Sequence, residues 1–358
     1  MNTIDFFKKL KQQLELNLPF VVYCKPNSNS IIALLQQNDV LYEVLDYTEK
    51  GFVFASFDGT QTFLIPENQS EIIATAFDEK ELIVAERAME IPDATAKNYF
   101  ENLVSKGVRA IENGEFKKVV VSRKEVLDLI DFDLVFAFQN TVLLYPTTFT
   151  YCFFHPKVGT WLGATPEQLL KAENNTFQTI ALAGTQKHNG SEAVVWEIKE
   201  QDEQQLVTDY ILAKLENVAS QVSVTNPYSF KAGNIWHIKT EISGILKSGC
   251  GLQQVVGLLH PTPAVCGMPK DQSKAFILEN ENYGRTFYTG FLGELNSSLS
   301  PNSISSDLFV NLRCMRICGS QAYLYMGCGI TKDSIPEKEW EESINKSLTM
   351  KKVLDCRV

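Results

Sequence analysis

The sequence predicts a globular protein built from both helices and strands, in one large or two medium domains. The chain has 358 residues, of which 44% are hydrophobic and 21% charged, so it can form a large core. Amphipathic helical segments also alternate along the chain with short apolar runs that have strand character. Both kinds of element are therefore expected in the fold.

Composition excludes several classes of partner. The net charge is −10 and basic residues form no run, which argues against nucleic acid and anionic membranes. The chain lacks an apolar run of the roughly 18 residues of a membrane span, and its N-terminal region lacks a signal-peptide core. We expect a cytoplasmic protein, in which any small anionic substrate would have to be bound by local cations. The eight cysteines show no metal or disulfide spacing and are predicted to be buried apolar residues.

The N-terminal third is predicted to be scaffold. Residues 4–16 form an amphipathic helix, and residues 20–24 form an apolar strand that ends at a Lys-Pro-Asn turn. Short strands follow at 51–57 and 62–65. No cluster of chemically active residues occurs before about residue 90.

The next helix and strand introduce the first candidate residue. A helix is predicted at 95–112, with an Asn-Gly C-cap, followed by a strand at 117–123. Alternation places Lys118, Val120 and Ser122 on one face of that strand. Lys118 either extends to solvent from the strand end, or is buried and acts as a base near neutrality.

A turn and a small-residue segment follow. Strands at 149–154 and 160–162 lead into a turn at 163–170 that presents Glu167, an acid that a turn would ordinarily leave solvated. Residues 180–185 are mostly small and suit close approach of a ligand to the backbone.

A long helix is predicted at 192–216, with Glu203 on its inward side. Its predicted inward stripe consists of Val195, Leu206, Val207, Tyr210 and Ile211. A buried, unpaired carboxylate is costly, so Glu203 would need a cation or a hydrogen-bond partner. The alternative is an ordinary acid near a helix start, favoured by the helix dipole.

Residues 258–269 form a Pro-rich loop that suits ligand contact, and residues 285–293 resemble a strand. A hairpin is predicted from 308–317 and 321–330. In that register Arg313 lies opposite Gly327 or its neighbour. An arginine there could bind a carboxylate through two hydrogen bonds.

The last predicted helix begins at Ser334, which forms a capping box with Glu337. Its apolar stripe is Trp340, Ile344 and Leu348. Glu339, Glu342 and Lys346 share an adjacent face. Two carboxylates there suit Mg²⁺, whereas the alternative is a solvated ion pair between Glu342 and Lys346.

Six segments, in this order, resemble the chorismate-utilising enzymes, and isochorismate synthases in particular. They are Lys118-Val-Val-Val-Ser-Arg, Gly163-Ala-Thr-Pro-Glu, Leu182-Ala-Gly-Thr, Leu259-His-Pro-Thr-Pro-Ala, Phe287-Tyr-Thr-Gly and Glu339-Trp-Glu-Glu. The resemblance covers about residues 95–350 and weakens before them, where the family varies.

The resemblance implies an α+β fold in which large, mostly antiparallel β-sheets pack face to face with helices outside. Residues 1–94 would be the variable N-terminal part of this fold, and 95–352 the chorismate-binding catalytic region. The implied substrate is chorismate and the implied cofactor is Mg²⁺. We expect a monomer or a weak homodimer.

The resemblance also implies roles for individual residues. Lys118 would activate water and Glu167 would protonate the departing hydroxyl. Glu203 and Glu342 would bind Mg²⁺, with Glu339 nearby. The implied substrate-lining residues are Gly184, Thr185, His237, Ala264, Tyr288, Arg313, Gly327, Gly329 and Lys346. Because chorismate is a dianion, Arg313 and Lys346 suit its carboxylates.

Relatives with other products differ at single positions. Anthranilate synthases lack a lysine at position 118, and aminodeoxychorismate synthases typically carry one at Ala183. The resemblance therefore favours isochorismate as the product. This product could supply either menaquinone synthesis or siderophore synthesis. A salicylate synthase, which also eliminates pyruvate, and a silent chorismate-binding protein are the alternatives. Two departures from the family are Gln204 in place of histidine, and Met326-Gly-Cys-Gly in place of a segment with alanines.

Overall fold

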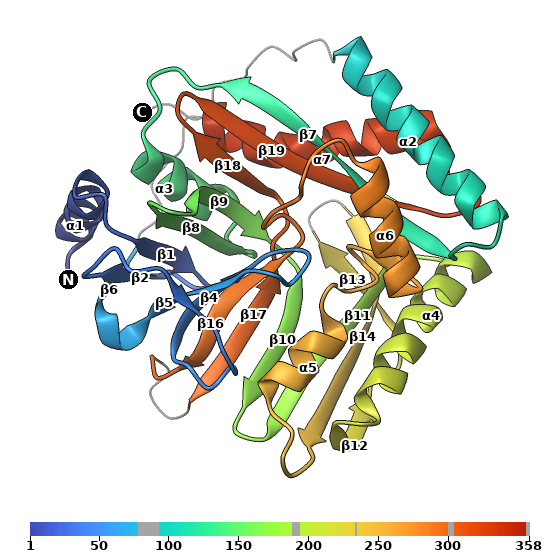
Figure 1. Ribbon diagram of the computed structural model, residues 1–358, viewed down its shortest axis with the longest axis horizontal. Coiled ribbons are helices and arrows are strands. Elements are labelled where there is room, and N and C mark those ends of the chain that lie inside the picture. Colours follow the sequence, from blue (N-terminus) through green and yellow to red (C-terminus); the bar gives the residue numbers. More distant parts are fainter. Residues whose placement is uncertain (78–92, 188–193, 233–234, 300–303, 356–358) are drawn as a thin grey trace.

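The computed structural model describes residues 1–77, 93–187, 194–232, 235–299 and 304–355. Within these ranges the chain forms two antiparallel sheets that face each other, with helices on the outer sides (Figure 1). This arrangement confirms the α+β fold that the resemblance implied. None of the helices within these ranges is long and apolar enough to cross a membrane.

Both sheets combine strands from the N-terminal and C-terminal parts of the chain. In spatial order, the first contains β15 (Gly267–Met268), β7 (Lys118–Asp128), β19 (Gln321–Ile330), β18 (Cys314–Cys318), β9 (Gly159–Thr165), β8 (Phe149–His155), β1 (Phe20–Cys24), β2 (Ser30–Gln36) and β6 (Ser70–Ala76). The second contains β12 (Ala219–Val224), β14 (Ile235–Leu246), β11 (Thr176–Lys187), β10 (Gln168–Glu173), β17 (Ser305–Val310), β16 (Phe291–Ser297), β4 (Gly51–Ala55), β5 (Thr62–Pro66) and β3 (Tyr42–Glu43), while β13 (Tyr228–Ala232) pairs with β14.

The helices bury their apolar sides against the outer faces of the sheets. They are α1 (Thr3–Glu15), α2 (Ala94–Glu112), α3 (Leu134–Leu144), α4 (Ile198–Leu215), α5 (Leu252–Leu259), α6 (Lys270–Asn280) and α7 (Pro336–Asp355), with a 3₁₀ turn η1 (Glu67–Gln69). One core lies between the first sheet and α1, α3 and the end of α7, and another lies beneath α4 and α5. A further core joins α2, α6 and α7 to β7.

Aromatic rings fill the space between the two sheets. Phe54 of the second sheet stacks on Phe153 of the first with ring centroids 4.4 Å apart, and Phe149 stacks on Phe309 at the same distance. Such rings bury large apolar areas, and offset stacking adds a modest favourable term. The interface between the sheets is therefore well packed, and it holds their relative position.

Several predicted elements are confirmed, and others differ. The N-terminal helix and the strands β1, β4 and β5 lie where the sequence placed them. The long helix starts at Ile198 instead of 192, and residues 188–193 lie outside the described residues. Val195 and Leu206 were wrongly placed on its inward stripe, since they are 84% and 40% exposed.

The predicted strand and hairpin near the C-terminus were partly wrong. Residues 286–289 form a turn, and strand β16 starts only at Phe291. The hairpin consists of β18 and β19, whereas Leu308 lies in β17 of the other sheet. The chain thus crosses from one sheet to the other at residues 311–313, immediately before the hairpin.

The inward side of α7 also differs from the predicted stripe. Leu348 is 37% exposed, while Ser343 and Ser347 are buried beside Trp340. Each serine hydroxyl donates to a carbonyl of its own helix, at 2.7 and 2.8 Å. Because that hydrogen bond satisfies the hydroxyl, a polar residue can occupy the buried side.

The cysteines partly follow the prediction. Five of those described are buried and none forms a disulfide, but Cys250 is half-buried and Cys318 is exposed.

A buried ion pair fixes β7 to the segment before β16. Arg285 donates to both carboxylate oxygens of Glu281, at 2.8 and 2.5 Å, and also to the carbonyls of Val120 and Val265. Both charged side chains are 2% exposed. Removing one partner would leave an uncompensated buried charge.

We expect Arg285→Ala to lower the free energy of unfolding by about 3–5 kcal/mol, the usual cost of breaking a buried pair. Lys97→Ala is the matched control because Lys97 and Glu101 form a partly solvent-exposed pair at 3.6 Å, with side chains 37% and 26% exposed, and such pairs contribute about 0–1 kcal/mol. Urea unfolding followed by circular dichroism measures both. Equal effects of the two variants would contradict the assignment.

Candidate active site

Lys118 is the first residue of β7, and neighbouring residues contact both its backbone and its side chain. The hydroxyl of Ser273 donates to its carbonyl oxygen at 2.9 Å, and a Cβ at Gly267 would lie 2.3 Å from the same oxygen. A Cβ at Gly329 would lie 3.2 Å from Lys118 Cε. The two glycines therefore leave room for the backbone and the stem of the lysine.

The ammonium group of Lys118 forms an ion pair with Glu203 on α4, with Nζ 2.6 Å from Oε1. The lysine side chain is 14% exposed. This contact joins a strand of the first sheet to a helix that covers the second (Figure 1). Glu203 thus faces inward and has a cationic partner. The sequence analysis predicted that it would need a cation or a hydrogen-bond partner.

Gln204 attaches this part of α4 to β14. Its side chain is buried, and its amide nitrogen donates to the hydroxyls of Thr208 and Thr240, at 2.9 and 2.7 Å. The glutamine that departs from the family pattern therefore makes specific hydrogen bonds at a buried position. They hold the helix that carries Glu203 against the sheet.

Glu167 lies in the short link between β9 and β10. Its amide donates to Thr165 Oγ1 at 3.3 Å, and its carbonyl accepts from the amide of Val310 at 2.9 Å. Burial raises the pKa of its carboxyl group to about 7, although the charges of Lys118, Lys346 and Arg313 oppose that rise. A large fraction of Glu167 is therefore protonated near neutral pH.

Arg313 lies at the crossing between the sheets, with φ of +48°. Its carbonyl accepts a hydrogen bond from the amide of Ala164 at 3.0 Å. Burial lowers the pKa of its guanidinium, which Tyr288 and Glu342 partly offset. In the part of the chain that the structure describes, the guanidinium forms no salt bridge. A half-buried cation of this kind suits an anionic ligand.

Arg313 was predicted to lie opposite Gly327 or its neighbour within the hairpin, but the structure places it outside the paired strands. The β18–β19 pairing starts at Met315 with Leu324, so Arg313 precedes the ladder. Gly327 instead leaves room for Tyr288, whose hydroxyl would lie 2.9 Å from a Cβ at that position. The carbonyl of Gly327 accepts a hydrogen bond from Lys346 Nζ at 2.8 Å.

The acids of α7 face β19. Glu342 and Lys346 form the i,i+4 ion pair of the alternative interpretation, with Nζ 2.5 Å from Oε1. Burial would raise the pKa of Glu342, but Lys346 and Arg313 outweigh it and the net shift is downward. Donor atoms of Glu342, Glu339 and Cys328 all lie within 4.8 Å of one another. Glu342 thus favours its ionised form and lies beside the carboxylate of Glu339.

Of the predicted magnesium ligands, the structure groups Glu339 with Glu342, while Glu203 contacts Lys118. Glu200 was missed by the sequence analysis. It lies one turn before Glu203, and among the described residues its buried Oε2 atom has no hydrogen-bond partner. The i,i+3 spacing of these two acids was the available signal. Carboxylates with an unsatisfied oxygen fit a hard divalent cation.

Of the remaining candidates, His237 and Gly184 contact each other, and the charges of Lys346, Arg313 and Glu342 act on the histidine. Nδ1 of His237 donates to the carbonyl of Gly184 at 3.0 Å, and burial lowers the pKa of that histidine. Gly184 has φ of +70°, which disfavours a side chain. Ala264 is half-buried in the loop after α5. The side chain of Thr185 lies outside the described residues.

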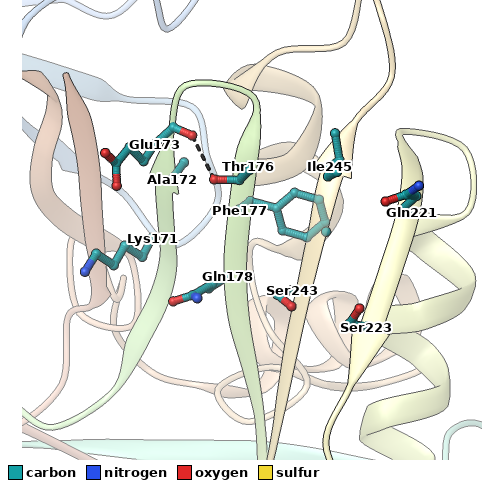
Figure 2. A pocket seen from close by; sticks show the side chains of 11 residues that line it. Lys171, Ala172, Glu173, Thr176, Phe177, Gln178, Gln221, Ser223, Ser243 and Ile245 are labelled. Atoms are coloured by element: carbon teal, nitrogen blue, oxygen red, sulfur yellow. Dashed lines mark hydrogen bonds between the residues drawn. The ribbon is translucent and has the colours of Figure 1, made fainter. Parts of the chain in front are cut away.

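A groove elsewhere on the molecule does not contain the candidate residues. Its volume is about 410 Å³, and it lies at the strands β10, β11, β14 and β12 (Figure 2). Polar side chains such as Lys171, Gln178 and Ser243 line it, and Thr176 donates to the carbonyl of Glu173 at 2.8 Å. None of the predicted catalytic, substrate or metal residues borders this groove.

Comparison with known proteins agrees with the geometry. The family described as chorismate binding enzyme matches residues 52–355. Isochorismate synthase EntC of Escherichia coli K12 is 29% identical over 305 residues, 81% of this chain and 74% of the relative. Isochorismate synthase MenF of Pasteurella multocida is 28% identical over 267 residues, 70% of this chain and 60% of the relative.

Solved structures share the fold. The menaquinone-specific isochorismate synthase MenF from Escherichia coli has a TM-score of 0.77 at 22% identity, covering 94% of this chain and 88% of that one. The family match spans most of the chain, and the fold agrees with it. The chain belongs to the chorismate-binding enzymes.

Proposed function

We propose that this chain is an isochorismate synthase, which converts chorismate reversibly to isochorismate with Mg²⁺. The observation that carries the proposal is Glu167, a carboxyl group with a pKa of about 7 surrounded by three cations. An acid that is protonated near neutrality can donate to a leaving hydroxyl. The cations can meanwhile hold the two carboxylates of chorismate.

The proposed reaction balances as a hydroxyl exchange with a shift of double bonds. Water forms a bond to one ring carbon and gives its proton to Lys118. The ring double bonds shift, and the hydroxyl on the other carbon leaves as water with the proton of Glu167. Bound Mg²⁺ would neutralise a substrate carboxylate, and Glu339 and Glu342 are the residues proposed to hold it, with Glu203.

The ion pair with Glu203 sets a condition on Lys118. The lysine can accept a proton only as the amine, so its 2.6 Å contact with Glu203 must open before water is activated. Oε1 of Glu203 is the oxygen engaged by the lysine. The role of Glu203 as a metal ligand and its contact with Lys118 are therefore coupled.

Product analysis tests the proposal most directly. Purified protein would be incubated with chorismate and Mg²⁺, and the products separated by chromatography. Isochorismate is the expected product. Salicylate with pyruvate would favour the salicylate synthase alternative, and unchanged chorismate would favour a silent binding protein.

We expect Arg313→Lys to lower kcat/KM severely, although it keeps the charge. Lysine lacks the planar fork that binds a carboxylate through two hydrogen bonds. Steady-state kinetics measure the change, and Arg316→Lys, at a half-buried position on β18, is the matched control. A near-wild-type value for Arg313→Lys, with the melting temperature retained, would exclude Arg313 from substrate binding.

A further inference from the structure

A thiol stands beside the two carboxylates of α7. Cys328 is buried on β19, and its Sγ atom and the carboxylates of Glu339 and Glu342 lie within 4.8 Å of one another. The thiol donates to the carbonyl of Glu339 at 3.3 Å. Among the described residues, no other group of three histidine, cysteine or acidic side chains brings its donor atoms this close.

The three donors come from two elements that are fixed to each other. Lys346 of α7 donates to the carbonyl of Gly327, the residue before Cys328. One turn earlier on α7, Arg123 of β7 lies over the ring of Trp340, 4.5 Å from its centroid, and donates to Ser343 at 2.8 Å. The thiol and the acids are thus held in place by contacts on both sides of the group.

The donor set differs from one that is selective for Mg²⁺. Mg²⁺ takes oxygen ligands and does not use sulfur, whereas Zn²⁺ and Cd²⁺ combine thiolate with carboxylate. With metal–ligand distances of about 2.0–2.3 Å, donors around a zinc ion lie roughly 3.5 Å apart. Because the three donor atoms lie no more than 4.8 Å apart, their separations need to shorten by at most about 1.3 Å, which side-chain rotation can provide.

We propose that Cys328, Glu339 and Glu342 form a site for a thiophilic divalent cation such as Zn²⁺ or Cd²⁺, which excludes Mg²⁺ from the same carboxylates. On binding, the S–H bond breaks, a metal–sulfur bond forms and the proton leaves to solvent, with no change of oxidation state. Glu342 exchanges its contact with Lys346 for the metal. The inhibition that follows rests on the proposed Mg²⁺-dependent function, but binding itself does not.

Cadmium titration tests the site directly. The background protein carries Cys250→Ser, Cys318→Ser and Cys356→Ser, which removes cysteines that could bind the ion elsewhere. Cd²⁺ is added and the ultraviolet thiolate-to-cadmium charge-transfer band is recorded. We expect saturation at one equivalent, and a weaker apparent affinity when Mg²⁺ is present in excess, because the two ions share carboxylates.

Substitutions at two of the donors, made in that background, separate their contributions. Cys328→Ala should abolish the band, with Cys328→Ser as a second variant in case alanine disturbs folding. Glu339→Gln should keep the band and weaken Cd²⁺ binding roughly tenfold or more. A band that persists without Cys328, the absence of any band in the background protein, or indifference to Mg²⁺ would each overturn the proposal.

Turnover of chorismate is measured on the same preparations. A normal cadmium band in a protein that does not convert chorismate would refute the proposed function and leave the metal site standing. Mg²⁺-dependent turnover without a cadmium band would do the reverse. The two failures are therefore distinguishable.

Discussion

Replacing Glu167 by glutamine should lower kcat by about a hundredfold or more while chorismate still binds, because the amide cannot donate the proton that the leaving hydroxyl needs. The pH dependence gives an independent signature. Since the acid works in its protonated form and its pKa is about 7, kcat/KM should fall as the pH rises through that value. Glu167→Gln should lose this dependence along with the activity. Steady-state kinetics across the pH range check both effects, and a wild-type turnover would remove Glu167 from the mechanism.

Lys118→Ala should cause a loss of similar size, since no base would then activate water. Lys117→Ala is the matched control, because that residue is the exposed neighbour on the other face of the strand. Labelled water supplies a second check: heavy oxygen from the solvent should appear in the new hydroxyl of isochorismate. An unlabelled product would mean that the original hydroxyl had migrated, and Lys118 would lose its proposed role.

Removal of divalent cations by a chelator should abolish activity, and Mg²⁺ should restore it. Glu342→Gln should reduce kcat/KM by roughly a hundredfold or more, since one of the two adjacent carboxylates no longer carries charge. Calorimetric titration should show weaker Mg²⁺ binding by this variant even without substrate.

Glu341→Gln is the control for that experiment, because Glu341 is the exposed neighbour on the same helix. Full turnover in excess chelator would contradict the metal requirement. Equal losses in the two variants would instead indicate a general effect on α7.

The sequence predicted elements well where periodicity and end signals agreed. The helix α2 ends at Glu112, Asn113 is its C-cap, and Gly114 follows with φ of +80°, as the Asn-Gly pair indicated. Helix α3 was missed for a physical reason: it is buried on most of its surface and apolar almost throughout, so it has no amphipathic period. Val195 was misplaced because it precedes the helix whose period was applied to it.

The individual residues of the candidate site could be predicted from the sequence, but the contacts between them could not. Strand alternation put Lys118 on one face, and the helical period put Glu203 inward, yet only the tertiary fold makes them partners. The raised pKa of Glu167 depends on surroundings supplied by segments far away in sequence. A local sequence pattern cannot predict contacts between segments that lie far apart in the sequence.

The place of β7 in its sheet bears on how the protein acquires activity. This strand, which begins with Lys118, the proposed catalytic base, lies between β15 and β19, so Val121 pairs with Cys328 and Val119 with Gly267. During synthesis β7 emerges long before either neighbour, and contacts between such distant segments form slowly. One edge of β7 therefore stays unpaired until β15 has been synthesised, and the other until β19 has been synthesised near the end of the chain. Assembly of the active site should be among the last events of folding, and a newly made chain should become protected from proteolysis at β7 only when α7 has docked.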